Sequence, residues 1–319
     1  MKKIFIVLVV VVFIALFSVN FYSGTEQIDD NLGNDGKIFN VGVLAYHGTN
    51  EKDFQKGFDD FRNFVPSSDK SEELLNDVFI NSLVQNRRVI HFYDSLMALI
   101  MDLRAKKIDE MILPESVGNY LLNHNSFYYN AYSTKILSSG VCFGFKNDNF
   151  ELKNEFDKAL SEMKTDGTLE KFAAQYVIAS YDRDPEPTRP PTIKNPAQEI
   201  KIAVTGDMPP IDMVAGDGKP AGYNTAVLAE LGKRLNKNIK FINTDAGGRS
   251  AALLSGRADV VFWYRLAKSS VAGDDPFDNL FKDAPEGVIL SSPYFSWENE
   301  IIIRLNDNKS LFGVFSSEK

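Results

Sequence analysis

The stretch GDMPPIDMVAGDGKPAGYN, residues 206–224, decides the fold class of this chain. The apolar run EIKIAVTG leads into it and predicts a buried strand, and GYNTAVLAELGKRLN at its end predicts a helix with one apolar face. Between them, the paired prolines and the Gly-Asp-Gly sequence predict a rigid loop and a tight turn. This order is typical of the start of an α/β domain, although the stretch lies far along a chain of 319 residues.

The same alternation of strand and helix continues on both sides of this stretch. Strands are predicted at residues 39–46, 87–93, 110–113, 138–147, 199–206, 239–244, 258–264 and 299–305. Helices are predicted at residues 47–64, 67–86, 94–109, 150–178, 222–236 and 247–257, with the 150–178 segment broken at Asp166-Gly167. Each half of the chain therefore predicts a small α/β unit with a largely parallel sheet.

The two halves also contain similar seven-residue segments. LRAKKID at residues 103–109 aligns with LLSGRAD at residues 253–259. In both, a helix ends, the chain turns, an aspartate follows, and an apolar strand begins. The similarity predicts that the two halves are variants of one supersecondary design.

A dense proline cluster separates the two halves. Pro185, Pro187, Pro190, Pro191 and Pro196 fall within one short segment, which excludes a helix or a central strand and predicts an extended linker. We therefore predict one α/β domain at residues 38–180, a linker at 181–198, and a second α/β domain with a terminal strand at 199–319.

The first residues predict export. Lys2 and Lys3 precede an apolar run at residues 4–16, which is typical of a signal peptide and short for a spanning helix. We expect residues 1–24 to form a cleaved signal or a membrane anchor and residues 25–37 to form a polar tether. The rest of the chain is then periplasmic or otherwise extracytoplasmic, and this anchor is its one expected link to a membrane.

Composition narrows the class of function. The chain is 44% hydrophobic and 24% charged, which is typical of a globular protein, and its net charge of −8 argues against binding to nucleic acid. The single cysteine, Cys142, lies in an apolar run, which predicts a small core residue. The three histidines, His47, His91 and His124, lack metal-site spacing, and we predict neither a metal nor a cofactor.

These segments together resemble the extracytoplasmic solute-binding proteins of family 3, the amino-acid-binding type of bacterial ABC importers. KIAVTGDMPP, GDGKPAGYN, LLSGRADVV and SSPYF resemble the family's first lobe. VGVLAYHGT, YDSLMALIMDLRAKKIDEMI and FGFKNDNFELKNEFDKALSEMKTDGTLEKF resemble its second lobe. The lobes occur here in reversed order, which predicts a circular permutation; two truncated copies in tandem are the alternative.

The resemblance implies a fold and a function. The implied fold is the periplasmic-binding-protein type II fold, in which two α/β lobes are joined by hinge strands. The implied function is reversible binding of a small polar solute, an amino acid or a related carboxylate, by closure of the lobes. The partner would be the membrane permease of an ABC importer, and no enzymatic activity is expected.

In the second lobe, the resemblance indicates ligand contacts at two strand ends. The loop containing Gly48, Thr49 and Asn50 is expected to offer backbone N–H and hydroxyl groups to a ligand carboxylate, while Thr49 and Asn50 are also plausible helix caps. Pro114 occupies the place of an aspartate that holds the ligand's ammonium group in the family. The neighbouring Glu115 is our candidate for that role, with a solvated turn residue as the alternative.

In the first lobe, the expected contacts follow a predicted strand. The family's Thr-x-x-Arg element, whose arginine binds the ligand carboxylate, is missing here, and Ile211 replaces a stacking aromatic residue. We name the nearest cations and aromatic residues as candidate ligand contacts: Trp263, Tyr264, Arg265 and Lys268. The alternatives are a core position for Trp263 and a solvated loop charge for Arg265.

Two other functions remain open at the level of sequence. A few proteins of this fold are periplasmic dehydratases, and an enzyme of that kind would need a cleft carboxylate, for which Glu115 is the candidate. A sensory or partner-binding ectodomain is favoured by the missing arginine and aspartate motifs.

Overall fold

The structure is a computed structural model of the whole chain. It describes residues 37–44, 59, 62–63, 65–67, 71–76, 78–85, 87–93, 95–134, 139–183, 186–245, 247–267, 285–297 and 299–306. These residues belong to one compact unit, residues 36–319. The predicted signal segment and almost all of the predicted tether lie outside the described residues. Within the described part, no helix has both the length and the apolar character needed to cross a membrane.

The first sheet has five strands in the order β2-β1-β3-β14-β4. Their bounds are β1 (Phe39–Leu44), β2 (Arg88–Tyr93), β3 (Glu110–Pro114), β4 (Tyr128–Thr134) and β14 (Glu300–Leu305). Strand β1 pairs with β2 and β3 in parallel, while β14 pairs with β3 and β4 antiparallel. Strand β14 is therefore an antiparallel insertion, from the far end of the chain, into an otherwise N-terminal sheet.

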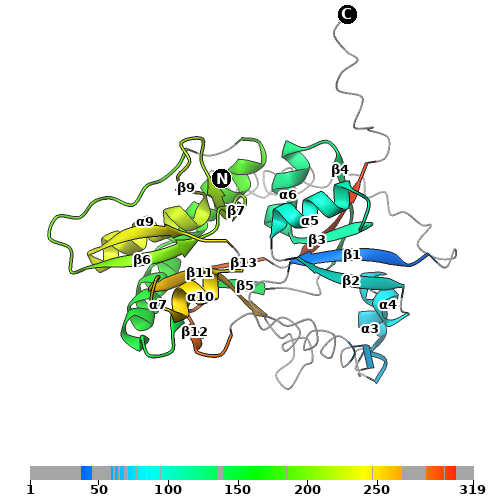
Figure 1. Cartoon of the computed structure of the whole chain (residues 1–319), viewed down its shortest axis with the longest axis horizontal. Coiled ribbons are helices and arrows are strands. Elements are labelled where there is room, and N and C mark those ends of the chain that lie inside the picture. The colour runs from blue at the N-terminus through cyan, green and yellow to red at the C-terminus, as the bar shows by residue number, and fades with distance from the viewer. Residues whose placement is uncertain are drawn as a thin grey trace, which may run out of the picture. The chain divides into compact units, whose positions relative to one another are not determined.

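Helices cover both faces of the first sheet. They are α3 (Ser71–Asn76), α4 (Val78–Val84), α5 (Leu96–Arg104) and α6 (Glu115–His124), with α3 and α4 on one face and α5 and α6 on the other (Figure 1). The alternation of the strands supplies both cores, since Ile301 and Ile303 pack with α5 and α6 whereas Ile302 packs with α4. All three isoleucines are almost fully buried.

The second sheet repeats this plan. Its order is β10-β6-β11-β5-β12, and β13 also pairs with β5. The bounds are β5 (Ser139–Lys146), β6 (Gln198–Val204), β10 (Lys237–Asn243), β11 (Val260–Ala267), β12 (Val288–Leu290) and β13 (Phe295–Trp297). Strands β10 and β11 pair with β6 in parallel, and β5 pairs with β11 antiparallel. Here the antiparallel insertion is β5, which comes from the N-terminal half.

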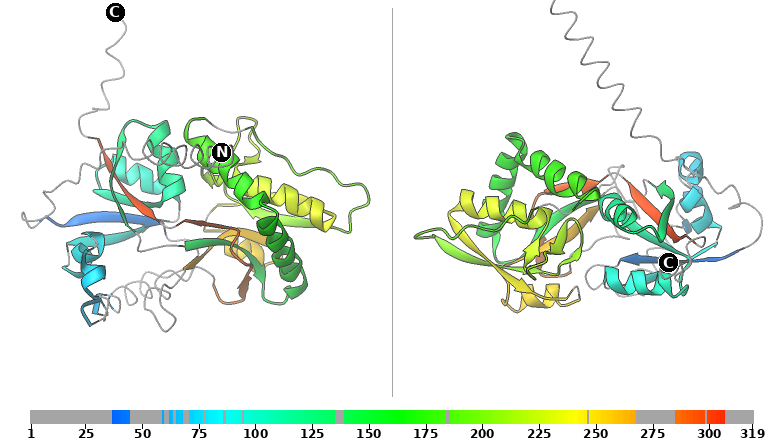
Figure 2. Two further views of the ribbon diagram at one scale, coloured as in Figure 1. Left: turned by 180° about the vertical axis from the view of Figure 1, so that it is seen from behind. Right: turned by 90° about the horizontal axis from the view of Figure 1, so that it is seen from above.

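Helices also cover both faces of the second sheet. They are α7 (Phe150–Thr165), α8 (Thr168–Ala173), the π-helix η2 (Ala174–Ile178), the 3-10 helix η3 (Ala179–Tyr181), α9 (Tyr223–Leu235) and α10 (Arg249–Leu254). The right view of Figure 2 shows α10 on the opposite side of this sheet from α7 and α9. Cys142 is fully buried in β5, which confirms the prediction of a core cysteine.

The two sheets exchange one strand each, through two crossovers. The chain passes from β4 to β5 and later from β13 to β14. These crossovers are paired, because Thr134 is the partner of Glu300 in the first sheet and Ser139 is the partner of Trp297 in the second. The predicted plan of two α/β sheets joined by hinge strands is therefore confirmed. Strand β5 belongs to the second sheet and α7 packs against it, although both precede residue 180. The division of the chain at the proline-rich segment therefore differs from the division between the two sheets.

The internal similarity noticed in the sequence has a matching structural basis. In the first sheet, a carboxylate oxygen of Asp109 accepts a hydrogen bond from the N–H of Asn40 at 2.8 Å, and the Asp109 N–H donates to the Asn40 carbonyl at 2.8 Å. In the second sheet, Asp259 makes the same two bonds to Lys201, each also at 2.8 Å. Each aspartate thus fastens the start of a strand, β3 or β11, to the neighbouring parallel strand, β1 or β6.

Residues 206–224 form the third sheet and the start of α9. Strands β7 (Asp207–Met208), β8 (Asp212–Val214) and β9 (Pro220–Ala221) pair antiparallel in sequence order. Gly222 then precedes α9 with φ +94° and ψ −169°, a conformation open almost only to glycine. A Cβ at this position would lie 2.5 Å from the carbonyl oxygen of Pro210, so the close approach also requires glycine.

Some elements were not predicted from the sequence. Helix α6 and strand β4 fall in the segment ESVGNYLLNHNSFYYNAYST, residues 115–134, in which polar residues interrupt the apolar period. Strand β4 has an exposed side chain at Tyr129 and a buried one at Ala131, and its place is fixed by pairing with the distant β14. The proline-rich segment behaves as expected, since its described residues 186–197 contain neither helix nor strand.

Candidate functional site

The carboxyl ends of the parallel strands lie at the crossovers in both sheets. In the first sheet, the last residue of β3, Pro114, is the partner of Glu300, the first residue after the returning crossover. In the second sheet, the last residue of β11, Ala267, is the partner of Ser139, the first residue after the outgoing crossover. Ligands of open α/β sheets bind beyond the carboxyl ends of the strands, so the residues that follow β1, β2, β3, β6 and β11 form the candidate site.

Glu115 is the one predicted ligand residue whose side chain the structure describes. It opens α6, directly after β3, where the helix dipole favours a carboxylate. Its backbone N–H donates to the carbonyl of Asn299 at 3.2 Å, and its carboxylate accepts a hydrogen bond from the Asn299 side-chain amide, also at 3.2 Å. Asn299 belongs to the returning crossover, so Glu115 couples the end of β3 to that hinge segment.

A tyrosine from the other half of the chain joins this cluster. Tyr181 ends η3, and its side chain is hydrogen-bonded to Asn119 of α6. Burial raises the pKa of Tyr181, and the negative charge of Glu115 raises it further. No local pattern in the sequence points to this tyrosine, because its contact with α6 is formed only when η3 and α6 meet in the folded chain.

A buried carboxyl group lies just beyond β6. Asp212 is 1% exposed, and one of its oxygens accepts hydrogen bonds from the Thr205 N–H at 3.1 Å, from the Thr205 hydroxyl at 2.8 Å and from the Gly206 N–H. Burial raises the pKa of Asp212 to about 7, although these hydrogen bonds act in the opposite direction. This carboxyl therefore holds the loop after β6 in place and titrates near neutral pH.

The loop after β6 also lies next to the first sheet's α5. Asp207 accepts a hydrogen bond from the Thr205 hydroxyl at 2.5 Å and opens β7, whose Cα atoms approach α5 within 8 Å. Helix α5 directly follows β2, and its first turn is capped by Ser95, whose hydroxyl accepts from the Ala98 N–H at 3.2 Å. The chain segments after β2 and after β6 are therefore neighbours.

The remaining predicted residues differ in how much the structure describes. Trp263, Tyr264 and Arg265 belong to β11, opposite β5, and the register between these strands shifts between Val261 and Tyr264. Such irregularities are common beside binding sites because they redirect side chains. The side chains of Trp263, Tyr264 and Arg265 lie outside the described residues, as do Lys268 and the loop of Gly48, Thr49 and Asn50.

A buried arginine near β11 was not predicted from the sequence. Arg249 opens α10, is 1% exposed, and its Nη1 lies 3.5 Å from the carbonyl oxygen of Phe262. The sequence feature that could have indicated it is that Arg249 begins the otherwise largely apolar segment RSAALL, on the face of the helix that is buried. The Arg249 guanidinium therefore lies beside the backbone of β11.

Cation coordination has no support in the described part of the chain. Among those residues, no group of three or more His, Cys, Asp or Glu side chains is arranged to hold a metal ion. The described side chains at the crossovers are carboxylates, an amide and a phenol, together with the buried arginine. They can hydrogen-bond a polar organic molecule.

Comparison with known structures found remote similarities. The VFT2 domain of BvgS from Bordetella pertussis is 12% identical with a TM-score of 0.35, and the match covers 89% of this chain and 86% of that one. The GluR0 ligand-binding core of Nostoc punctiforme is 13% identical with a TM-score of 0.32, covering 84% and 85%. A ligand-binding component of an ABC-type import system from Staphylococcus aureus is 8% identical with a TM-score of 0.36, covering 84% and 66%.

Sequence comparison gave one match. No curated protein matches the chain. Residues 200–264, which run from β6 into β11 and contain the stretch that decided the fold class, match the family of bacterial extracellular solute-binding proteins, family 3. The match covers part of the region on which the resemblance stated from the sequence depends, and the resemblance is confirmed over that stretch.

Proposed function

We propose that this protein binds a small polar solute, an amino acid or a related carboxylate, between its two α/β lobes, and that lobe closure delivers the solute to the permease of an ABC importer. The observation that supports this most directly is the paired crossover. Both sheets place the carboxyl ends of their parallel strands there, and two hinge segments allow the lobes to rotate. On this proposal the protein acts outside the cytoplasm and binds its ligand reversibly.

The proposed ligand contacts come from both lobes. Glu115 would bind an ammonium or hydroxyl group, because its carboxylate already lies at the crossover in contact with Asn299. Gly48, Thr49 and Asn50 would receive a carboxylate at the loop after β1, and Arg265, Lys268, Trp263 and Tyr264 would complete the site from β11. Support for the second group is the position of β11, whose carboxyl end is paired with the start of β5.

A thermal-shift screen of the full-length chain against amino acids and small carboxylates tests the proposal. A ligand that binds only the folded state at a hundredfold excess over its Kd raises the stability by about 2.7 kcal/mol. We expect at least one compound to raise Tm with saturation. A flat response across the panel would contradict solute binding and favour a sensory or partner-binding ectodomain.

The variant Arg265→Ala tests the proposed cation. We expect it to abolish the carboxylate-dependent rise in Tm, because the guanidinium supplies the paired hydrogen bonds that recognise a carboxylate. Arg257→Ala is the matched control, since Arg257 precedes β11, is not among the proposed ligand contacts, and donates a hydrogen bond to the Asn243 carbonyl. An undiminished shift in Arg265→Ala would show that another cation binds the ligand.

A further inference from the structure

A small pocket lies at the edge of the first sheet opposite the crossovers. Its volume is about 210 Å³, and it is lined by Lys37, Phe39, Leu103, Lys106, Ile108, Asp109, Tyr129, Arg304 and Leu305. Phe39 is the first residue of β1 and Leu305 is the last residue of β14. Because β1 runs toward the crossovers, its first residue lies away from them, and this pocket is distinct from the proposed solute site.

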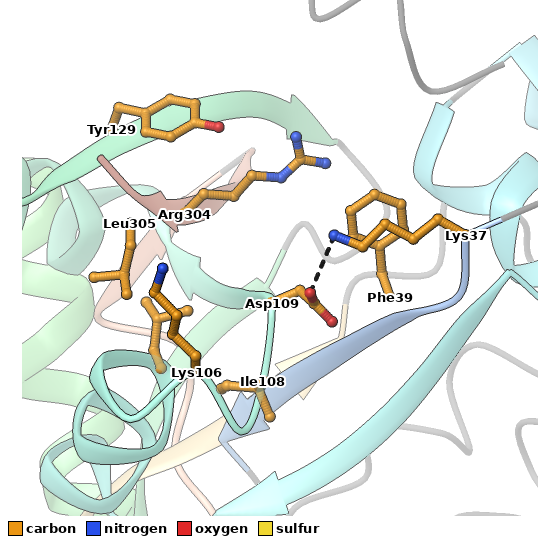
Figure 3. A pocket seen from close by; sticks show the side chains of 9 residues that line it. Lys37, Phe39, Lys106, Ile108, Asp109, Tyr129, Arg304 and Leu305 are labelled. Atoms are coloured by element: carbon orange, nitrogen blue, oxygen red, sulfur yellow. Dashed lines mark ion pairs between the residues drawn. The ribbon is translucent and has the colours of Figure 1, made fainter. Parts of the chain in front are cut away.

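The lining combines a cationic rim with an apolar base. Three cations, Lys37, Lys106 and Arg304, come from the segment before β1, the turn after α5, and β14 (Figure 3). The one carboxylate in the lining is Asp109. The apolar base is provided by the side chains of Phe39, Leu103, Ile108 and Leu305. The pocket thus reverses the sign of charge locally, in a chain whose net charge is −8.

Asp109 already has a structural task. It pairs with Lys37 at 3.2 Å and accepts the Asn40 N–H at 2.8 Å. Burial works to raise the pKa of Asp109, but the hydrogen bonds from Asn40 and Lys37 outweigh it and hold the pKa below its usual value. Asp109 therefore remains ionised and stays engaged with the start of β1, which leaves the rim with a net positive charge.

Arg304 is fixed in position and firmly cationic. Its side chain is 11% exposed, and its Nε and Nη2 contact one carboxylate oxygen of Glu110 at 2.9 and 2.5 Å. Burial works to lower the pKa of Arg304, but Glu110 and Tyr129 more than offset this and raise it. Glu110 also pairs with the buried Arg88 at 2.9 Å, so one carboxylate is shared by two arginines and the pocket wall has a buried excess of positive charge.

The Phe39 ring holds two of the pocket's cations beside it. The Lys37 ammonium lies 4.5 Å and the Arg304 guanidinium carbon 4.9 Å from the centre of the Phe39 ring. Such contacts hold cations in place at a partly desolvated surface. A ligand would therefore meet charges whose positions are set before binding, and less conformational entropy is lost on association.

We propose that this pocket is a second binding site, which takes a small organic carboxylate whose apolar body contacts Phe39 and Leu305. The carboxylate would accept hydrogen bonds from Lys106 and Arg304, and the apolar base explains why an organic anion fits better than a compact inorganic one. The site is independent of the solute site proposed at the crossovers.

Isothermal titration of the full-length chain with benzoate, benzamide and inorganic phosphate tests this proposal. Benzoate carries a carboxylate on an apolar ring, benzamide is its neutral counterpart, and phosphate lacks the apolar body. We expect saturable binding of benzoate that is at least tenfold tighter than that of benzamide or phosphate. Equal affinity for benzoate and benzamide, or no saturable binding of benzoate, would overturn the proposal.

Matched variants locate the benzoate. Lys106→Gln removes a rim cation from the turn after α5, and we expect it to weaken benzoate binding at least fivefold. Lys107→Gln is the control, because its ammonium pairs with Asp102 at 2.8 Å and does not line the pocket. Arg265→Ala should leave benzoate binding intact, which separates this pocket from the crossover site. Loss in Lys107→Gln equal to that in Lys106→Gln, or loss confined to Arg265→Ala, would overturn the assignment.

Discussion

Asp212, in the stretch of residues 206–224, makes the free energy of unfolding depend on pH. Its pKa is raised by burial to about 7 from an ordinary value of 3.8, so the folded state binds its proton more tightly than the unfolded chain does. Between about pH 4 and pH 7 the free energy of unfolding therefore falls as pH rises, by up to about 4 kcal/mol from this group, and the contribution is constant above pH 7.

We expect Asp212→Asn to remove this dependence, because an amide keeps the shape and the acceptor for Thr205 without a titratable proton. Urea unfolding at pH 4.5 and pH 7.5 measures it: the variant should gain stability relative to the natural chain at the higher pH. Asp217→Asn, at an exposed turn, should keep the natural chain's slope over that range. An unchanged slope in Asp212→Asn would contradict the assignment.

At the scale of elements, a shared carboxylate ties together the strands of the first sheet. Glu110 opens β3 and is fully buried, and it pairs with Arg88 of β2 and Arg304 of β14. Arg88 also donates hydrogen bonds to the hydroxyls of Ser82 and Tyr132. Strand β14 is thus held in the first sheet by an ion pair as well as by its backbone pairing with β3 and β4.

We expect Glu110→Gln to lower the free energy of unfolding by about 3–5 kcal/mol. The substitution leaves the guanidinium groups of Arg88 and Arg304 without their counter-charge in a desolvated site. Chemical denaturation measures the loss. Glu230→Gln removes a surface partner of Lys233 and Arg234 and should change stability by less than about 1 kcal/mol. Similar losses in both variants would show that the buried cluster is no more important than a surface pair.

At the scale of the whole molecule, the order of the lobes remains a prediction that the positions of the chain segments make testable. Lys37 and Leu305 line the same pocket, so the two limits of the folded core lie close together. Adjacent ends are the condition under which a circular permutation is tolerated. The proline-rich linker joins η3 to β6, and its Arg189 pairs with Asp217 at 2.9 Å.

We expect a reordered chain, residues 199–306 joined by a short Gly-Ser linker to residues 37–182, to fold to the same structure. Circular dichroism and cooperative thermal unfolding measure this against a control of residues 37–306 in natural order, which keeps the proline-rich linker that the reordered chain lacks. Both should unfold in one transition at similar Tm. If the control folds and the reordered chain does not, the linker is required and permutation is contradicted.

Local patterns were sufficient to predict most of the secondary structure and the hinge strand. The apolar run within 299–305 predicted a strand because burial on both faces requires continuous apolar sequence. The segment of α6 and β4 was missed because its polar residues break that period. Of the side chains described in the candidate site, the sequence named Glu115 because it follows a strand, and its role there stays a prediction. Asp212, Tyr181 and Arg249 were not named, since their contacts depend on groups that folding brings close.

The sequence by itself determined the α/β class, the buried cysteine, the repeated aspartate before β3 and β11, and the match of residues 200–264 to a family model. Each of these depends on local periodicity or on a short motif. Only the tertiary structure decided that β5 and β14 are exchanged between the sheets, that the carboxyl ends of both sets of parallel strands lie at paired crossovers, and that Lys106 and Arg304 share a pocket. The physical reason is that strand partners and charge clusters are set by contacts between residues far apart in the chain, and local propensity does not encode those contacts.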